Sequence, residues 1–233
     1  MDRNTKTKLL NLVKNNYNDI ADSFDQTRKK PLWPELNKLA GEVQEGESVM
    51  DVGCGNGRLL YGLPDKTDYV GVDFSQELVH KAQHNFPDHK FREGDILELS
   101  KIEEVGFDHV FCVAVLHHIP SFDLRVQALQ QLKNKVKKDG RIVVTVWNLW
   151  TRADFRKLIL RYFLLKLFKK NNMDFGDIIF EWKGEEKDQI VKKRYYHAFT
   201  KRELKKLVRR SGLRLRELKK DKYNYYLILE TKK

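Results

Sequence analysis

Hydrophobic and polar residues follow two different periods along the middle of this chain. Five short runs rich in β-branched or aromatic residues predict strands at residues 48–52, 69–73, 90–93, 109–113 and 141–147. Between several of these runs, apolar residues recur every three or four positions and predict helices, notably at residues 76–84 and 124–136. Alternating strands and helices are typical of an α/β fold, in which right-handed crossovers place helices on both faces of a mostly parallel sheet.

The two ends of the chain have different patterns. Residues 5–24 predict an amphipathic helix, and Pro31 and Pro34 end any helix soon after it, before a second short helix. The last third begins with a predicted basic amphipathic helix (152–170) and an irregular acidic and aromatic stretch (171–188). A predicted strand (194–199) and a helix (201–210) follow, and the helix is capped by Thr200 and ended by Gly212. Two closing strands are predicted at residues 213–218 and 225–230. We expect the closing strands to form an antiparallel edge of the sheet.

Charge is concentrated in the last third of the chain. The 233 residues carry a net charge of +12, yet residues 151–233 contain 25 Lys and Arg against 11 Asp and Glu, whereas residues 1–150 contain 20 against 22. Such asymmetry indicates an anionic partner, either nucleic acid or a membrane surface, for the C-terminal part. Solubility is the alternative explanation.

The composition narrows the class of protein. With 41% hydrophobic and 11% aromatic residues, the chain is typical of a folded protein rather than a disordered or fibrous one. Cys54 and Cys112 provide neither a disulfide framework nor the spacing of a zinc site, so we expect a reducing compartment and no metal. The N-terminus lacks a secretory pattern, and Arg161 and Lys166 interrupt the most apolar stretch, so we expect a cytoplasmic protein.

A glycine-rich segment follows the first predicted strand. It reads Asp51-Val52-Gly53-Cys54-Gly55-Asn56-Gly57 and stands where a doubly wound sheet places its ligand crevice, beyond the carboxyl end of a strand. Glycines let the backbone turn tightly and approach a ligand without an intervening Cβ. A glycine-rich turn alone is weak evidence, because several kinds of nucleotide-binding fold contain one.

Two acidic residues strengthen this interpretation. Asp73 ends the second strand, 20 residues after Gly53, where a carboxylate can accept both hydroxyls of a ribose. Asp95 follows the third strand and is placed to meet an adenine. Each acid alone has a structural alternative as a helix cap, but three such features at the ends of three successive strands are hard to explain as caps.

Between residues 46 and 147 the chain resembles the class I S-adenosylmethionine-dependent methyltransferases. The resemblance implies a Rossmann-like fold with a mostly parallel seven-stranded sheet and an antiparallel C-terminal edge. It also implies that residues 51–57 wrap the methionine part of S-adenosylmethionine, that Asp73 binds its ribose and that Asp95 contacts its adenine. Phe74, Ile96 and Ala114 complete the expected cofactor site. The pattern lacks the third glycine of a Gly-x-Gly-x-x-Gly motif, which argues against a nicotinamide enzyme.

Three further segments resemble a narrower family, the tRNA wobble-uridine carboxymethyl methyltransferases. They are residues 17–28, Ala114-Val115-Leu116-His117-His118 and Arg194-Tyr195-Tyr196-His197-Ala198-Phe199. That family esterifies the carboxylate of 5-carboxymethyluridine in the tRNA anticodon loop, and its eukaryotic members use a small zinc-binding activator subunit. Because no internal repeat or low-complexity linker divides the chain, we expect one domain, with an N-terminal helical cap (1–45), a cofactor-binding core (46–150), a basic helical insertion (151–193) and closing strands and helix (194–233).

Such a reaction needs positioning rather than a general base. A carboxylate is already ionised at neutral pH, because carboxyl pKa values lie near 4. Arg28 is the first candidate to hold it, since a guanidinium binds a carboxylate through two parallel hydrogen bonds. The resemblance adds His117 or His118, Tyr196 and His197 as residues facing the uridine. Because adjacent residues differ in orientation, we expect only one of the two histidines to line the pocket, and core packing is the alternative for both.

The basic last third then has a use in tRNA binding. Its cations would contact phosphates, and Trp147, Trp150 and Trp182 could stack on a splayed base. The cations are Arg152, Arg156, Lys157, Lys169, Lys170, Lys192, Lys193, Arg194, Lys201, Arg202, Lys205, Lys206, Arg209 and Arg210. Two alternatives remain open: a small-molecule or lipid methyltransferase whose basic helix docks on a membrane, and a cofactor-binding protein without catalysis, which the intact glycine and acid positions disfavour.

Overall fold

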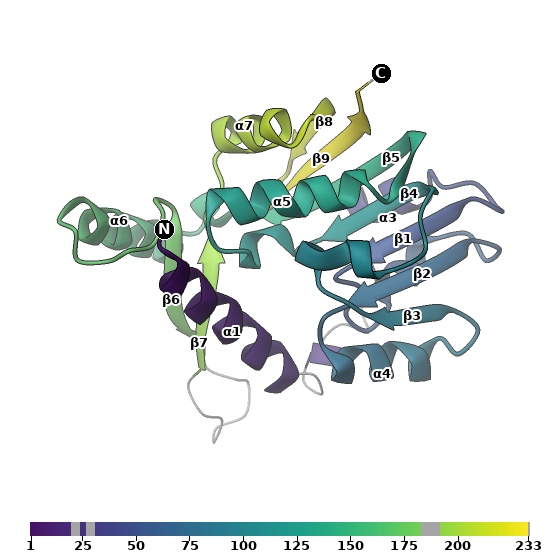
Figure 1. Cartoon of the computed structure of the whole chain (residues 1–233), viewed down its shortest axis with the longest axis horizontal. Helices are drawn as coiled ribbons and strands as arrows, with labels where there is room; N and C mark the ends of the chain where they lie inside the picture. Colours follow the sequence, from purple (N-terminus) through teal and green to yellow (C-terminus); the bar gives the residue numbers. More distant parts are fainter. Residues whose placement is uncertain (20–23, 27–30, 183–191, 233) are drawn as a thin grey trace.

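The fold is centred on one twisted, mostly parallel sheet. The computed structural model describes residues 1–19, 24–26, 31–182 and 192–232. The sheet has seven strands in the order β3-β2-β1-β4-β5-β9-β8 (Figure 1). They are β1 (Ser48–Val52), β2 (Asp68–Asp73), β3 (Lys90–Glu93), β4 (Phe107–Val113), β5 (Val136–Trp147), β8 (Leu213–Lys220) and β9 (Asn224–Thr231). Strands β1 to β5 pair in parallel, whereas β9 is antiparallel to both β5 and β8. The predicted α/β class and the antiparallel C-terminal edge are confirmed.

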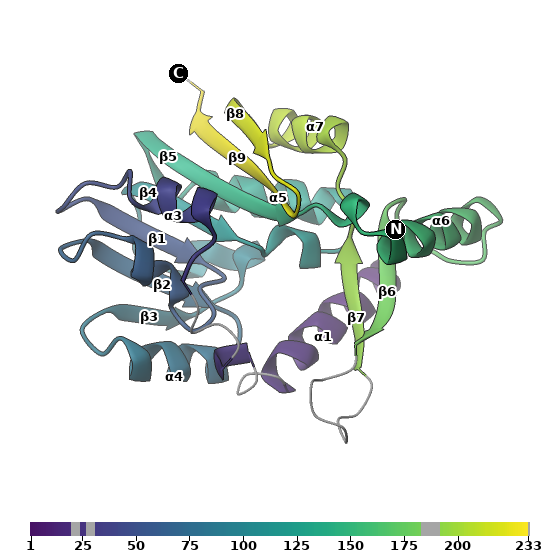
Figure 2. The same cartoon turned by 180° about the vertical axis from the view of Figure 1, so that it is seen from behind.

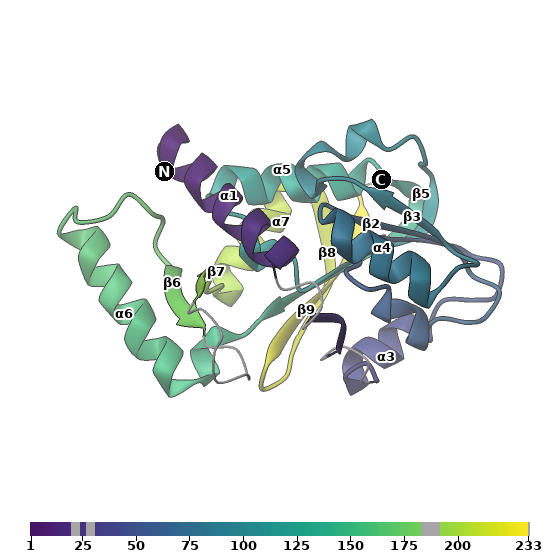
Figure 3. The same cartoon turned by 90° about the horizontal axis from the view of Figure 1, so that it is seen from below.

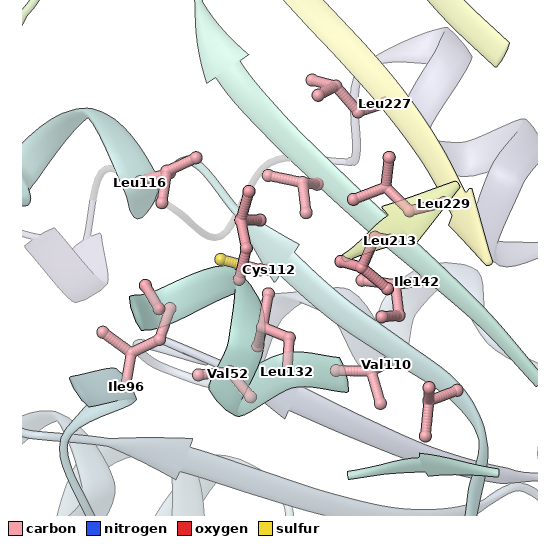
Figure 4. Close-up of a cluster of buried hydrophobic side chains, with 14 of the residues drawn as sticks. Val52, Ile96, Val110, Cys112, Leu116, Leu132, Ile142, Leu213, Leu227 and Leu229 are labelled. Atoms are coloured by element: carbon pink, nitrogen blue, oxygen red, sulfur yellow. The ribbon is translucent and has the colours of Figure 1, made fainter. Parts of the chain in front are cut away.

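Helices cover both faces of this sheet because successive strand residues point to opposite sides. Val110 and Phe111 of β4, for example, are both fully buried, but they belong to different hydrophobic clusters. One face packs against η2 (Ile96–Lys101), α5 (Phe122–Lys133) and α7 (Lys201–Ser211), and the other against α3 (Pro34–Ala40), η1 (Arg58–Gly62) and α4 (Gln76–Asn85). Figure 4 shows the first cluster, in which Leu213 of β8 lies beside Ile142 of β5 and Leu132 of α5 is also buried.

A second group of elements lies beside the sheet. β6 (Asp177–Trp182) and β7 (Lys192–His197) form an antiparallel pair that contacts α1 (Arg3–Asp19) and α6 (Ala153–Leu167). Figures 1 and 2 show this group to one side of the sheet, with α6 outermost, and Figure 3 shows the same arrangement from below. We call α6, the β6–β7 pair and α7 the basic lobe.

Several predicted elements differ from the structure. The prediction of an irregular stretch over residues 171–188 is wrong for β6, whose Ile178 pairs with Tyr196 and is fully buried. Polar residues in this stretch suggested an exposed loop, but Asp177 is buried, where it pairs with Arg125. The helix expected over residues 124–136 ends at Lys133, and β5 begins at Val136 rather than at residue 141. The N-terminal helix reaches Asp19 and residues 24–26 are again helical, while residues 20–23 lie outside the described residues.

Candidate active site

A cavity of about 350 Å³ opens at the carboxyl ends of the central strands. The loops that follow β1, β2, β3 and β4 line it, together with Trp147 at the end of β5 and Tyr17 of α1. The residues expected at the site that line the cavity are Asp51, Gly53, Cys54, Gly55, Asn56, Asp73, Phe74, Ile96, Ala114 and His118. The sequence therefore located the crevice at the place where a doubly wound sheet binds its ligand.

The glycine-rich loop leaves β1 in a conformation that side chains rarely adopt. Gly53 and Gly55 have φ angles of 76° and 57°. A Cβ on Gly53 would lie 2.2 Å from Cγ2 of Val115, and a Cβ on Gly55 would lie 2.9 Å from the Phe24 ring. The backbone N–H of Gly53 donates to the carbonyl of Val72 at 2.7 Å and ties the loop to β2. Glycine is thus required both for the turn and for the space above it.

Asp73 joins the ends of β1 and β2 through its carboxylate. Its Oδ2 accepts a hydrogen bond from the backbone of Gly55 at 2.9 Å, and its Oδ1 accepts one from Ser75 at 2.9 Å. Burial raises the pKa of Asp73 to about 6, although these backbone hydrogen bonds act in the opposite direction. Each oxygen keeps a further lone pair, so the carboxylate can also accept two hydroxyls from a bound sugar.

Asp51 is a buried acid with one unsatisfied oxygen. Its Oδ2 accepts a hydrogen bond from the Tyr69 hydroxyl at 3.0 Å, whereas its Oδ1 is buried and has no hydrogen-bond partner within the described part of the chain. Burial raises the pKa of Asp51 to about 7, and the nearby Asp73 adds to the increase. Buried polar atoms without a partner are rare in folded proteins. A positively charged ligand group in the cavity would satisfy this oxygen.

An apolar slot follows these two acids. Phe74, Leu78 and Ile96 line the cavity beyond β2 and β3. The exposed Asp95 lies outside the lining, and its Oδ1 accepts from the backbone N–H of Leu97 at 2.8 Å. The Asp95 carboxylate therefore caps the start of η2. This capping role was the structural alternative to the expected contact with adenine.

The N-terminal segment covers the glycine-rich loop. Oδ1 of Asp25 accepts hydrogen bonds from the side-chain amides of Asn56 at 2.9 Å and Asn85 at 3.0 Å. The Phe24 ring stands over Gly55, and Tyr17 packs edge-on against Phe24, with ring centroids 5.9 Å apart. Asn56 thus links the glycine-rich loop to Asp25 of the N-terminal segment. The sequence marked residues 17–28 as one motif, but it did not reveal that Asp25 fastens this motif to the loop.

The far end of the cavity is aromatic. Nε2 of His118 lies 2.8 Å from the Tyr17 hydroxyl, and burial lowers the pKa of His118 to about 3. His118 is therefore neutral at physiological pH and a weak base. His117 is fully buried outside the lining, where its ring stacks on Trp147 with centroids 5.0 Å apart. The two histidines differ in orientation, as adjacent residues were expected to do.

Tyr196 and His197 point to opposite sides of β7. The Tyr196 ring packs on His118 at 4.8 Å and on Trp147 at 5.0 Å, so it supports the aromatic end of the cavity from behind. His197 is fully buried away from the cavity, with Nδ1 2.6 Å from Asp177 and Nε2 2.9 Å from Glu203. In this position His197 serves the packing of the basic lobe, which does not favour the contact with a uridine that the resemblance implied.

Two further placements complete the predicted site. Gly57 lies outside the cavity lining and precedes η1 with a φ angle of 81°. Arg28 lies outside the described residues.

Arg58 is the one cation among the described lining residues. Its guanidinium carbon lies 5.6 Å from the centre of the Trp33 ring, and its Nη2 donates to the carbonyl of Pro31. No sequence pattern singled out Arg58, because the residue directly follows the glycines and has no spacing signal of its own.

A family model described as a methyltransferase domain matches residues 43–212, which is most of the chain. The chain belongs to this methyltransferase family. The match begins before β1 and ends after α7, so it includes the strand-end loops that line the cavity and all elements of the basic lobe, but not the lining residues of the N-terminal segment. The resemblance on which the predicted cofactor site rests is confirmed.

Curated relatives of this methyltransferase carry a specific name. A tRNA (carboxymethyluridine(34)-5-O)-methyltransferase of Schizosaccharomyces pombe is 29% identical over 223 residues, covering 92% of this chain and 93% of the relative. The protein with that name from Saccharomyces cerevisiae is 34% identical over 133 residues, covering 57% of this chain and 47% of the relative. The chain thus matches nearly all of one relative and about half of the other.

Solved structures share the fold of this methyltransferase. An S-adenosylmethionine-dependent methyltransferase from Methanosarcina mazei has a TM-score of 0.68 at 17% identity, covering 87% of this chain and 99% of that one. A Haloferax volcanii putative methyltransferase in complex with the Trm112 methyltransferase activator has a TM-score of 0.64 at 16% identity, covering 95% and 98%. At these identities the likeness establishes the fold.

The methyltransferase cavity fits S-adenosylmethionine, the methyl donor of enzymes with this fold. The unsatisfied Oδ1 of Asp51 suits the positive charge of the donor, Asp73 suits its ribose, and the slot of Phe74 and Ile96 suits its adenine. Within the described ranges, no group of three His, Cys, Asp or Glu side chains is arranged to hold a metal ion. In the same part of the chain, no helix is long and apolar enough to cross a membrane.

Proposed function

We propose that this methyltransferase transfers a methyl group from S-adenosylmethionine to the carboxylate of a modified wobble uridine, of the 5-carboxymethyluridine type, in tRNA. The names of the Schizosaccharomyces pombe and Saccharomyces cerevisiae relatives support this substrate. The observation that carries the proposal is the acceptor end of the cavity, where the Tyr17 hydroxyl lies 2.8 Å from Nε2 of His118 and burial lowers the pKa of that imidazole to about 3. A weak base suits an acceptor that is already ionised and needs no proton removed.

The chemistry follows from that charge state. When bound, S-adenosylmethionine would supply an electrophilic methyl group. A carboxylate oxygen would bond to the methyl carbon as the carbon–sulfur bond breaks, giving a methyl ester and S-adenosylhomocysteine with no proton transferred. The protein must hold the acceptor in line with the methyl group and exclude water, and positioning of this kind can contribute about 7–11 kcal/mol. The aromatic wall of Tyr17, His118 and Trp147 is suited to both tasks.

In this proposal, different lining residues bind different parts of the cofactor. Asp73 accepts the ribose hydroxyls, Asp51 meets the amino group, and Arg58 pairs with the carboxylate of the methionine part. The Tyr17 hydroxyl fixes the ring of His118 through its 2.8 Å hydrogen bond. Arg28 stays the candidate for the acceptor carboxylate.

The partners in this proposal are tRNA and a small activator subunit. The archaeal neighbour that was solved with an activator supports such a subunit as a candidate partner. A cytoplasmic location belongs to the same proposal, because a tRNA substrate is found there. Methylation by the purified chain, with and without a co-expressed activator, tests the need for that subunit.

Nucleoside mass spectrometry of tRNA tests the substrate. We expect tRNA from cells lacking the gene to accumulate the free carboxymethyl nucleoside, and the purified enzyme to convert it to the methyl ester. Incubation with a lipid and small-acid extract of the same cells is the parallel experiment. Methyl transfer to that extract, with none to the tRNA, would show that the enzyme is a small-molecule or lipid methyltransferase.

A further inference from the structure

Helix α7 presents two rows of cations to solvent. Lys201, Lys205 and Arg209 form one row, and Arg202, Lys206 and Arg210 form the other. All six side chains are exposed, and none forms an ion pair with another described residue. Like charges four residues apart repel on a helix surface, and cations in a first turn oppose the helix dipole. A bound polyanion would compensate both effects.

A groove of about 740 Å³ runs beside these rows, between α7, α6 and the turn before β6. Three exposed aromatic side chains line it: Trp150, Phe163 and Phe175 are 37%, 43% and 53% exposed. The rings of Phe163 and Phe175 lie 5.2 Å apart. Arg202 and Lys206 belong to both the groove and the cation rows, so the aromatic surface and the charged surface are continuous.

Several of these side chains are held in place. The Trp150 indole N–H donates to the carbonyl of Phe199 at 2.9 Å, and Nη1 of Arg156 donates to the carbonyl of Trp150 at 3.0 Å. Nζ of Lys206 lies 4.9 Å from the centre of the Phe122 ring. A surface with fixed rings and fixed cations loses little entropy when it binds a ligand.

The two acids in the groove are already engaged. Glu203 accepts hydrogen bonds from Arg125 and His197, at 3.4 and 2.9 Å. Asp174 accepts one from the backbone of Phe122 at 3.1 Å and pairs with the chain's amino terminus at 3.5 Å. Four cations, Arg125, Arg156, Arg202 and Lys206, also line the groove, so its net charge is positive.

We propose that α7 and this groove form an RNA-binding surface separate from the methyl-transfer cavity. The cation rows bind phosphates, and the aromatic groove takes an unpaired base of the same RNA. The inference rests on the proposed tRNA substrate and extends it. Trp147 lines the cavity and Trp150 lines the groove, only three residues further along the chain, so one RNA can reach both.

Paired variants test the surface by tRNA binding and by steady-state kinetics of the full chain. We expect Arg202→Ala with Lys206→Ala to weaken tRNA binding about tenfold at low salt and to lower the slope of log Kd against log salt concentration by about 1 to 2. The KM for tRNA should rise while kcat and the affinity for S-adenosylmethionine stay unchanged. Lys90→Ala with Lys138→Ala, which removes two exposed cations elsewhere, is the matched control.

The aromatic groove has its own variant. Phe163→Ala with Phe175→Ala should weaken tRNA binding by about fivefold or more without changing the salt slope, because stacking involves no counterion release. Tyr223→Ala, which removes an aromatic side chain 59% exposed outside the groove, is the control. Equal tRNA affinity in test and control variants overturns the inference, even if the enzyme still methylates tRNA.

Vesicle binding separates RNA from a lipid surface. The probes are phosphatidylcholine vesicles with and without phosphatidylserine, and we expect no difference between wild type and the variants. If the variants lose binding to phosphatidylserine vesicles and keep their tRNA affinity, the surface is a membrane-docking site and the inference is wrong. If the enzyme methylates no tRNA at all, the proposed function fails, whereas direct tRNA binding still reports on this surface.

Discussion

Buried carboxylates occur in two regions of this protein, and their surroundings are opposite. In the cavity, the buried Asp51 and Asp73 form no ion pair with a described residue, and burial raises their pKa values to about 7 and 6. In the basic lobe, burial alone would raise the pKa of Asp177, but hydrogen bonds from His197 and Tyr195 and the charge of Arg125 keep that pKa below its ordinary value.

The difference separates a binding site from a scaffold. Asp177 has its counter-ion inside the protein, since Nη2 of Arg125 lies 2.9 Å away and both side chains are fully buried. The cavity lacks such a partner for Asp51, whose Oδ1 has none within the described residues. In a site for a cationic ligand, ionisation of a buried carboxylate is unfavourable until the ligand binds. In a scaffold, a cation of the protein itself compensates the buried carboxylate.

The largest expected effect is on the scaffold. Replacing Arg125 with Met would leave Asp177 as an uncompensated buried charge, so we expect the free energy of unfolding to fall by about 3–5 kcal/mol. Urea denaturation followed by circular dichroism measures this change. Adding Asp177→Asn to that variant should recover part of the loss, and a loss below about 1 kcal/mol would contradict the scaffold assignment.

The second effect is on the cavity. Asp73→Ala removes the proposed ribose acceptor, and we expect the Kd for S-adenosylmethionine to rise about 100-fold, equivalent to about 2.7 kcal/mol. Isothermal titration calorimetry measures the affinity. Asp95→Ala is the matched control, since its carboxylate caps η2 outside the cavity lining. An equal loss in the two variants would restore the predicted adenine contact of Asp95.

The third effect concerns the unfavourable ionisation of Asp51 in the ligand-free protein. A folded-state pKa of about 7 means that ionisation destabilises the fold as pH rises from about 4 through 7. Asp51→Asn cannot ionise, so at pH 8 we expect the ligand-free variant to be about 1–3 kcal/mol more stable than wild type, with no gain near pH 4. Thermal unfolding across this pH range measures it, and a gain that does not depend on pH would refute the explanation.

The smallest effect is on the pH dependence of cofactor binding. S-adenosylmethionine carries a positive charge, so it should favour the ionised forms of Asp51 and Asp73. We expect its affinity to rise about three- to tenfold between pH 5.5 and 8 in wild type. The dependence should be shallower in Asp51→Asn. The same steepness in both proteins would assign the titration to another group.

The core of the fold could be predicted because its signals are local. Strands β1, β2, β4 and the second half of β5 are buried on both faces and contain short apolar runs, and the spacing of the glycines in the glycine-rich loop requires one backbone path. The positions of Gly53, Asp73 and Phe74 in the cavity follow directly from that path.

The basic lobe could not be predicted as well because its order depends on distant partners. β6 pairs with β7 across residues 183–191, and the buried Asp177 of β6 pairs with Arg125, which lies 52 residues earlier in the chain, on α5. The covering role of Asp25 likewise depends on Asn56 and Asn85. Sequence periodicity reports which side of an element is buried, but it does not report which polar groups meet there.

The uneven charge of the chain has a kinetic consequence. Residues 151–233 hold the excess of positive charge, whereas residues 1–150 are nearly neutral, so the charge is distributed asymmetrically along the chain. An approaching polyanion exerts a torque on such a molecule before contact, so that productive orientations are sampled first and the association rate increases. This preorientation acts over about 10 Å or less at physiological ionic strength and weakens steeply as salt is added.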